Sequence, residues 1–194
     1  MKIANIILAA GSSTRMQQTK QVLPYKDTTL LGNAVQQAEG TALLDVYVVL
    51  GANAAEIKTQ INVKEEQVFI NLNWKKGLGS SIAHGIVELQ KLDEEYSAVL
   101  ISLADQPLID SAYLTKMVSL FSTSVSTIVA TNYGERVGVP AIFDSQYYAE
   151  LRELNEDFGA KEILIKHASE IVMVEPNGKE IDVDTQQDYN SIAH

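Results

Sequence analysis

The chain has 194 residues, of which 46% are hydrophobic, and this is sufficient for one domain with a sizeable core. Its formal net charge of −10, without any Lys/Arg cluster, excludes a general nucleic-acid binder, which needs a basic face. The absence of cysteine excludes disulfides, thiolate metal sites and a cysteine nucleophile. The acidic composition fits a soluble cytoplasmic protein, and no apolar run approaches the roughly 20 residues that a membrane span needs.

The first predicted element is a buried strand at residues 2–8, whose short apolar run resembles a weak signal peptide when it is considered alone. Polar and charged residues follow at once without a clean cleavage context, which favours a core strand. Further strands are predicted at 45–50, 67–70, 97–103, 127–131, 139–143, 171–174 and 180–183. Helices are predicted at 28–38, 53–60 (Asn53 as N-cap), 80–92, 111–121 (Asp110 or Ser111 as cap), 145–154, 159–167 and 186–193 (Thr185 as cap).

Strands alternate with helices through the first 130 residues, which predicts a mostly parallel sheet with helices on both faces. The last third loses this alternation and is predicted to be an α+β segment of the same domain. There, the Pro-Asn-Gly turn at 176–178 is expected to join strands 171–174 and 180–183 in a hairpin. Ligands of such sheets bind at the carboxyl ends of the strands, so we expect the segments 9–20 and 104–107 to be neighbours.

The stretch Ile6–Pro24, IILAAGSSTRMQQTKQVLP, begins as a strand and then breaks into small residues around Gly11. Two cations follow, Arg15 and Lys20. Small residues let backbone N–H groups approach phosphate oxygens closely, and the cations add charge, so one interpretation is a polyphosphate-binding loop. The alternative is a plain turn between a strand and a helix. Neither the P-loop pattern nor the G-x-G-x-x-G fingerprint is present.

Three aspartates are candidate metal ligands. Asp105 follows a fully apolar strand and either ligates Mg²⁺, which prefers oxygen ligands and bridges substrate phosphates, or caps the turn before Pro107. Asp182 and Asp184 would share one face of the predicted strand 180–183 and its continuation, with Ile181 and Val183 directed to the core. The alternative is that Asp182 is solvated and that Asp184 caps the last helix.

The stretch 77–81, GLGSS, enters a predicted helix, and helix N-termini attract anions. The alternative for these serines is plain N-capping. Trp74 is interpreted as a packing residue of the core or rim. His84, His167 and His194 are scattered without metal-ligand spacing and are interpreted as structural or surface residues. A Ser/His/Asp hydrolase is not supported, because the nucleophile elbow is missing.

Five segments, ILAAGSSTRM…K…LP, NWKKGLGSS, SLADQPLI, GVPAIFD and DVDTQQDY, together resemble the nucleotidyltransferases that activate the molybdenum cofactor. The molybdenum-cofactor cytidylyltransferase branch is the most similar, and the resemblance extends over essentially the whole chain. It implies a Rossmann-like three-layer α/β/α nucleotidyltransferase fold with a mostly parallel mixed sheet. It also implies a single domain over residues 1–194, with a nucleotide-binding part at about 1–110 and an acceptor-binding and closing part at about 111–194.

The resemblance further implies an Mg²⁺-dependent reaction, in which the acceptor's terminal phosphate attacks the α-phosphate and pyrophosphate leaves. The implied catalytic residues are Arg15, Lys20 and Asp105, and the implied metal ligands are Asp105 and Asp184. The implied nucleotide-binding residues are Leu8, Ala9, Ala10, Gly11, Ser12, Arg15, Lys20, Gly79, Ser80, Ser81 and Asp105. Nucleotidyl transfer needs positioning and charge neutralisation more than a strong base, which agrees with the scattered histidines.

Base and acceptor also follow from the resemblance. The cytidylyl branch tends to carry A-A-G where the guanylyl branch carries A-G-G, and Ala9-Ala10-Gly11 matches the cytidylyl branch. The expected physical reason is that the methyl group of Ala10 narrows the nucleotide pocket and favours the smaller pyrimidine of CTP. The implied acceptor is molybdopterin, and a molybdoenzyme is the implied protein partner. The alternatives are a different NTP, a sugar or polyol phosphate acceptor, or a non-catalytic nucleotide-binding accessory protein for molybdoenzyme maturation.

The chain departs from the family pattern at three places. Gln17 and Ala104 stand where glycines are usual, and one additional residue separates Arg136 from Gly138 before Pro140. The third departure lies on the expected acceptor side, so the identity of the acceptor stays open.

Overall fold

The computed structural model describes residues 1–16 and 18–192, so that Gln17, Ala193 and His194 lie outside the described residues. Its strands are β1 (Ile3–Ala9), β2 (Pro24–Tyr25), β3 (Thr28–Thr29), β4 (Leu44–Leu50), β5 (Val68–Ile70), β6 (Ala98–Leu103), β7 (Ile128–Asn132), β8 (Val137–Asp144) and β9 (Ile171–Val174). Its helices are α1 (Leu30–Glu39), α2 (Ala54–Lys58), α3 (Leu78–Leu89), α4 (Ser111–Thr123), α5 (Tyr148–Arg152), α6 (Lys161–Lys166) and α7 (Gln186–Ile192).

The main sheet is mixed and mostly parallel, as the sequence predicts. Across the described residues it has seven strands in the order β5-β4-β1-β6-β8-β7-β9, and β2 and β3 form a separate ribbon. β1 pairs in parallel with β4 and β6, whereas β8 is antiparallel to both β6 and β7. Every residue of β1 is buried because both faces of the strand are covered, which explains why all of its residues except Asn5 are apolar.

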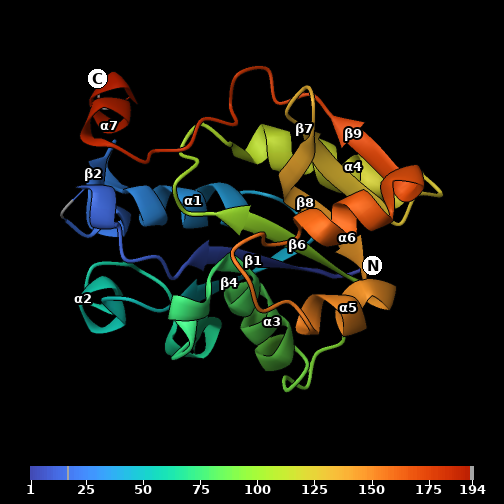
Figure 1. Cartoon of the computed structure of the whole chain (residues 1–194), viewed down its shortest axis with the longest axis horizontal. Helices are drawn as coiled ribbons and strands as arrows, with labels where there is room; N and C mark the ends of the chain where they lie inside the picture. The colour runs from blue at the N-terminus through green and yellow to red at the C-terminus, as the bar shows by residue number, and fades with distance from the viewer. Residues whose placement is uncertain (17, 193–194) are drawn as a thin grey trace.

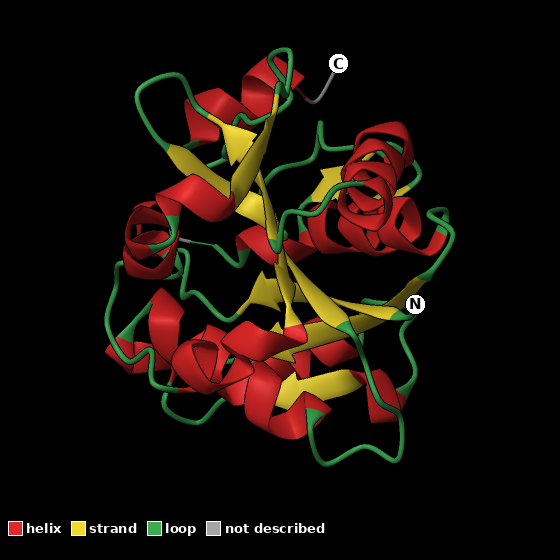
Figure 2. Ribbon diagram, turned by 90° about the vertical axis from the view of Figure 1, so that its right-hand side faces the viewer, coloured by secondary structure: helices red, strands yellow, loops and turns green. Residues whose placement is uncertain are grey.

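Helices cover both faces of the sheet (Figures 1 and 2). One core layer joins the sheet to α1 and α4 through residues such as Leu31, Val35 and Met117. The other layer joins it to α3, α5 and α6 through residues such as Ile86 and Leu151. This three-layer arrangement confirms the predicted α/β/α fold. Among the described residues, none of the helices has the length and apolarity that crossing a membrane requires.

The predicted hairpin around 176–178 is wrong. β9 forms as predicted but pairs in parallel with β7, and residues 180–183 form no strand. Instead the chain runs from the turn back to the end of β6, where Val183 N donates to Asp105 O at 2.8 Å. Val183 is fully buried against the β2–β3 ribbon, whereas Ile181 is 46% exposed and is not a core residue. Burial of Val183 and its backbone hydrogen bond therefore prevail over the local hairpin signal.

Several helix termini also differ from the prediction. α3 begins at Leu78, directly after Gly77 at φ +100°, so that the serines lie inside the helix and do not cap it. Asn53 precedes α2 but makes no capping bond, because its backbone is left-handed (φ 55°, ψ 22°) and not extended as a cap requires; its side-chain amide donates instead to Thr19 Oγ1 at 2.9 Å. The predicted caps Asp110 and Thr185 are confirmed, since each side chain accepts a hydrogen bond from a backbone N–H of the helix that follows.

Candidate functional site

The loop after β1 takes its shape from a buried side chain, that of Gln21. Gln21 Nε2 donates to the carbonyl oxygens of Ala9 and Gly11, at 3.1 and 2.8 Å. Ser13 Oγ donates in turn to Gln21 Oε1 at 3.2 Å. A Cβ added at Gly11 would meet no protein atom within 4 Å. Packing within the protein therefore does not require a glycine here, and the space beside Gly11 is free for a ligand.

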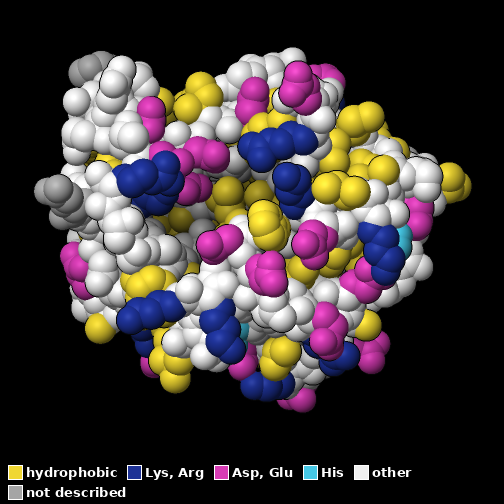
Figure 3. Space-filling view, in the orientation of Figure 1, with side chains coloured by type: hydrophobic (Ala, Val, Ile, Leu, Met, Phe, Trp, Pro, Cys, Tyr) yellow, Lys and Arg dark blue, Asp and Glu magenta, His cyan; other side chains and the backbone are white. Residues whose placement is uncertain are grey.

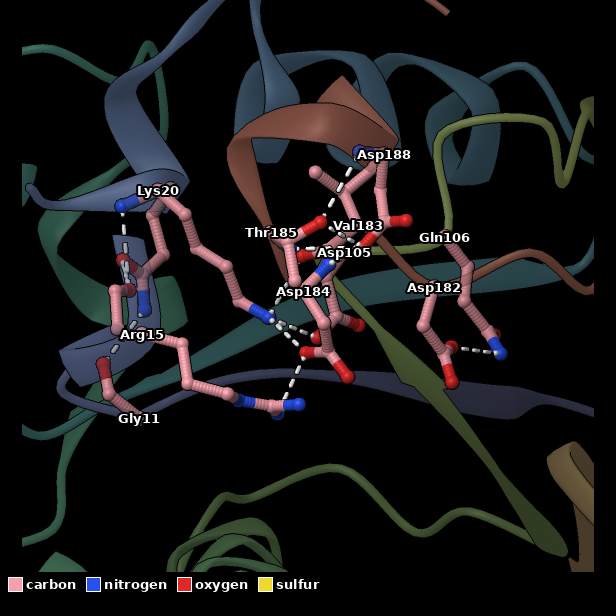
Figure 4. Close-up of polar contacts among 12 residues, drawn as sticks. Gly11, Arg15, Lys20, Asp105, Gln106, Asp182, Val183, Asp184, Thr185 and Asp188 are labelled. Atoms are coloured by element: carbon pink, nitrogen blue, oxygen red, sulfur yellow. Dashed lines mark hydrogen bonds and ion pairs between the residues drawn. The ribbon is translucent and has the colours of Figure 1, made fainter. Parts of the chain in front are cut away.

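Lys20 connects this loop to acidic residues from much later in the chain (Figure 4). Its Nζ lies 2.5 Å from Asp105 Oδ2 and 3.2 Å from Asp184 Oδ1, and it donates to Val183 O at 3.1 Å. Arg15 Nη2 lies 3.0 Å from the same oxygen of Asp184. Burial by itself would lower the pKa of Lys20, but the charges of Asp105 and Asp184 outweigh it and raise the pKa. Lys20 is therefore a permanent cation at neutral pH.

The sheet topology explains why these segments meet. β1 and β6 are adjacent and parallel, so the loops at their carboxyl ends lie together. Ala104 N donates to Leu8 O at 3.1 Å and continues the strand pairing into the loop. The predicted proximity of segments 9–20 and 104–107 is thus confirmed.

Two contacts fasten segment 182–184 to the end of β6. One is the backbone bond from Val183 to Asp105, and the other is the bond from Gln106 Nε2 to Asp182 Oδ1 at 2.9 Å. Gln106 is only 3% exposed. Loss of surrounding water, followed by the negative charge of Asp105, raises the pKa of Asp182. Asp182 therefore serves as a hydrogen-bond partner of Gln106, whereas Asp184 faces the two cations.

Arg15, Lys20, Asp105 and Asp184 border a cavity of about 630 Å³. It is visible left of centre in Figure 3 as a hollow bordered by side chains of both charges. The predicted site residues that line it are Leu8, Ala9, Ala10, Gly11, Ser12, Arg15, Lys20, Ser81, Asp105 and Asp184. The lining excludes Gly79, whose N–H donates to Glu156 O at 2.8 Å, and Ser80, whose hydroxyl donates to Gly77 O at 2.9 Å.

The cavity also has walls that the sequence analysis missed, namely Gln21, Trp74, Lys75 and Asp157. Trp74 comes close because Gly51 lacks a side chain: a Cβ there would lie 2.5 Å from Trp74 Cβ and 2.8 Å from Ala10 O. Trp74 and Lys75 belong to the segment NWKKGLGSS, and this closeness in sequence to GLGSS was a signal by which both could have been predicted. Asp157 reaches the site from the loop between α5 and α6, and its backbone packs against Gly77.

The acids of this cavity suit a hard divalent cation. Within the described part of the chain, no three His, Asp or Glu side chains gather into a ready set of metal ligands. However, Asp105 Oδ1 is buried and has no hydrogen-bond partner. Mg²⁺ is commonly held by one or two carboxylates together with substrate phosphates. Asp105 and Asp184 therefore fit a metal that is completed by a phosphorylated substrate.

A second cavity of about 320 Å³ adjoins the first and shares Leu78, Leu103 and Asp157 with it. Its other lining residues include Gln106, Tyr133, Arg136, Phe158, Lys161 and Asp182. Two cations, two carboxylates and two aromatic rings thus line a space that borders Gln106, the residue after Asp105.

Comparison with known proteins gives a match to the family model described as the MobA-like NTP transferase domain, over residues 5–171. The purine catabolism protein PucB of Bacillus subtilis is 24% identical over 200 residues, covering 98% of this chain and 95% of PucB. The nicotine blue oxidoreductase of Paenarthrobacter nicotinovorans is 30% identical over 106 residues. That match covers 54% of this chain and 50% of the oxidoreductase, so it spans about half of either protein.

Among solved structures, Rv0371c from Mycobacterium tuberculosis superposes with a TM-score of 0.83 at 26% identity, covering 100% of this chain and 97% of Rv0371c. A second Rv0371c structure, described as a complex with manganese, superposes with a TM-score of 0.80 at 24% identity, covering 100% of this chain and 98% of the other. These similarities agree with the architecture of sheet and helices described above.

Proposed function

The chain belongs to the MobA-like NTP transferase family, and we propose that it transfers CMP from CTP to the terminal phosphate of molybdopterin, releasing pyrophosphate. The observation that carries the proposal is Lys20, held between Asp105 and Asp184 at the edge of the larger cavity. A nucleotidyltransferase needs cations for the triphosphate and acids for a metal at one place. This cavity brings both together.

The loop after β1 is proposed to hold the triphosphate. The free space beside Gly11 admits phosphate oxygens close to the backbone, and Arg15 and Lys20 supply positive charge. In this proposal Arg15 and Lys20 neutralise the charge that builds up on the leaving pyrophosphate. Charge neutralisation and alignment are the main requirements of such a transfer.

Asp105 and Asp184 are proposed to hold Mg²⁺. The support is the buried, unpartnered Asp105 Oδ1 and the all-oxygen character of the pair. The metal, when bound, would neutralise phosphate charge and make the α-phosphorus a better electrophile. Gln106 and Val183 would keep the carboxylates of Asp105 and Asp184 at a fixed distance from each other, because their hydrogen bonds hold segment 182–184 against the end of β6.

The preference for CTP is proposed from the close packing around Ala10 and Trp74, which both line the larger cavity. Ala10 O and the Trp74 side chain lie so near Gly51 that a Cβ at that position would clash with both. The methyl group of Ala10 removes further space, which favours a pyrimidine over a purine. Ser81 lines the same cavity and is proposed to contact the nucleotide.

The second cavity is proposed to bind the acceptor. Arg136 and Lys161 suit an anionic molecule, and Tyr133 and Phe158 offer flat apolar surface. An acceptor phosphate reaching past Gln106 would arrive beside Asp105. One of its oxygens would then bond to the α-phosphorus while the bond between the α-phosphorus and the bridging oxygen breaks. The acceptor phosphate is already ionised at neutral pH, so no proton has to be removed. A molybdoenzyme that receives the product is the protein partner that this activity implies.

The test is pyrophosphate release by the purified protein with Mg²⁺, each of the four NTPs in turn, and molybdopterin. We expect release that requires molybdopterin and is fastest with CTP. Omission of the acceptor is the control for simple hydrolysis. Release that depends on a sugar or polyol phosphate instead of molybdopterin would correct the acceptor. Faster reaction with GTP would overturn the base assignment.

A further inference from the structure

Lys20 uses all of its hydrogen-bonding capacity within the protein. An ammonium group has three donors and no acceptor. Its three contacts are Asp105 Oδ2 at 2.5 Å, Val183 O at 3.1 Å and Asp184 Oδ1 at 3.2 Å. The side chain is 14% exposed. No donor remains for a phosphate oxygen, so the cation proposed for the triphosphate is committed to the acids while nucleotide is absent.

The acids are committed in the same way. Asp105 Oδ2 is engaged by Lys20, and Asp184 Oδ1 is shared between Lys20 and Arg15 (Figure 4). Two cations thus balance two carboxylates. A divalent metal entering alone would meet the ammonium group of Lys20, and a triphosphate entering alone would meet the carboxylates. Either ligand alone is therefore opposed by a like charge at short range.

We propose that Lys20 is an exchangeable counter-ion that makes metal binding and nucleotide binding strongly cooperative. The triphosphate draws Lys20 and Arg15 from the carboxylates, and the released carboxylates bind the divalent metal. This inference rests on the proposed role of the larger cavity as the nucleotide site, and it adds the coupling between the two ligands. Thermodynamic linkage requires the nucleotide to raise the metal affinity by the same factor as the metal raises the nucleotide affinity.

The exposure of the two cations indicates which exchange is easier. Arg15 has a side chain that is 68% exposed, so its contact with Asp184 is screened by water and easily replaced. Lys20 is largely buried, so it leaves Asp105 only when another anionic group, such as a phosphate, takes the place of this carboxylate. Asp105 Oδ1 has no partner in the protein, so it offers the metal one oxygen for which nothing competes.

The first measurement is Mn²⁺ binding to the whole chain, followed by the electron paramagnetic resonance signal of the free ion. It is made with and without the α,β-methylene analogue of CTP, which lacks the cleavable bond. Because the phosphates of the analogue chelate Mn²⁺ by themselves, the same titration with analogue and without protein is subtracted. After this correction we expect the Kd of the protein for Mn²⁺ to fall about tenfold or more with saturating analogue. Trp74, the single tryptophan, lines the cavity, and its fluorescence reports binding of the analogue. A Kd for Mn²⁺ that does not change when the analogue is bound overturns the inference.

The second measurement uses two charge-removing variants. K20M keeps the side-chain length without the ammonium, and we expect it to bind Mn²⁺ alone about tenfold more tightly than the wild type and to lose most of the cooperativity. Lys75 lines the same cavity with its Nζ 5.6 Å from the Trp74 ring, so K75M is the matched control. Its Mn²⁺ affinity without nucleotide is expected to stay within about twofold of the wild type. An equal gain of Mn²⁺ affinity in K20M and K75M would mean that any lysine of the cavity repels the metal through the general electrostatic potential, and it would overturn the specific role of Lys20.

These experiments separate the inference from the proposed function. Circular dichroism verifies that K20M is folded. If K20M does not fold, the effect of the CTP analogue on Mn²⁺ binding by the wild type decides whether the inference holds. If no CTP, GTP, ATP or UTP analogue changes the fluorescence of Trp74 in the presence of Mn²⁺, the proposed function fails. Tighter Mn²⁺ binding by K20M would even then support Lys20 as the counter-ion of the acids, and unchanged binding would overturn it.

Discussion

Two charged clusters in this protein have similar chemistry and different surroundings. The first is the cavity cluster of Arg15, Lys20, Asp105 and Asp184. The second is the histidine cluster, in which His167 lies between Glu150 and Glu170, with Nε2 and Nδ1 each 3.1 Å from a carboxylate oxygen. The cavity cluster joins segments that are distant in the sequence and lines the larger cavity, whereas the histidine cluster lies within residues 150–170 and lines neither of the two cavities described above.

The clusters differ in whether their polar atoms are satisfied. In the histidine cluster both ring nitrogens have a carboxylate, and Glu170 Oε2 also accepts from Tyr147 at 2.5 Å and Thr127 at 3.0 Å. In the cavity cluster Asp105 Oδ1 is buried without a partner. A buried polar atom without a partner is costly unless a ligand completes it. The comparison thus supports the proposed binding role of the first cluster and a structural role of the second.

The strongest test of this contrast removes one acid from each cluster. Asp105→Asn takes away the proposed metal ligand, and we expect pyrophosphate release to fall about 10³-fold, as is typical when a principal electrostatic group is lost. Glu170→Gln changes a carboxylate of the histidine cluster in the same way, and its activity should stay within about twofold of the wild type. Mg²⁺-dependent activity of Asp105→Asn within tenfold of the wild type would remove Asp105 from the metal site.

The next test compares the lysines. Lys20→Ala removes a cation from the proposed triphosphate site, and we expect kcat/KM for CTP to fall about 10²-fold. Lys166→Ala removes the lysine that pairs with Glu150 at 2.9 Å, and kcat/KM should not change measurably. The measurement is kcat/KM of both lysine variants, obtained from steady-state kinetics over a range of CTP concentrations. Equal losses would mean that the two clusters do not differ in function.

A smaller difference is expected within segment 182–184. Asp184 faces the cations and Asp182 faces Gln106, so Asp184→Asn should cost about tenfold more activity than Asp182→Asn. Asparagine keeps the size of each side chain and removes its charge. Rates at saturating CTP and acceptor are compared for the two variants. The reverse order would place the second metal ligand at Asp182.

Much of the cavity cluster follows from the sequence for a definite reason. The mostly apolar sequences of β1 and β6 predict buried parallel strands, and the neighbouring carboxyl ends of these strands bring Lys20 to Asp105. Hydrophobic patterning and the alternation of strands and helices were sufficient to predict that Lys20 and Asp105 lie close together. The family resemblance added the metal role, which remains a prediction.

The remaining parts of the site depend on tertiary contacts that leave no local signal. A Pro-Asn-Gly turn predicts a hairpin, yet burial of Val183 determines the path of segment 180–183. Gln21 resembles any polar loop residue, although its two bonds to backbone carbonyls shape the loop. Asp157 arrives at the cavity from a loop about 80 residues beyond Gly77, against whose turn it packs. The histidine cluster likewise has no recognisable motif in the sequence, because the contact of His167 with Glu150 depends on how the short helices α5 and α6 pack.

The smallest expected effect is a pH dependence that belongs to the histidine cluster alone. Hydrogen bonding to Glu170, and then to Glu150, outweighs burial and raises the pKa of His167 above its usual value of 6.5. A raised pKa means that the folded state binds the proton more tightly than the unfolded state. The resulting stability is fully present below pH 6.5 and is lost as the pH rises through the higher pKa of the folded protein.

We therefore expect His167→Gln to lower the Tm by about 2–4 °C near pH 5.5 and by clearly less near pH 8.5. Measurements stay above pH 5, because the pKa values of Glu150 and Glu170 are lowered and their contribution declines only in more acidic solution. The matched variant is K20M, whose effect on Tm should not change between these pH values, because Lys20 has a raised pKa and stays charged throughout. The measurement is the Tm of the wild type, His167→Gln and K20M at both pH values. A pH-independent effect of His167→Gln would show that the cluster contributes by packing rather than by the proton that it holds.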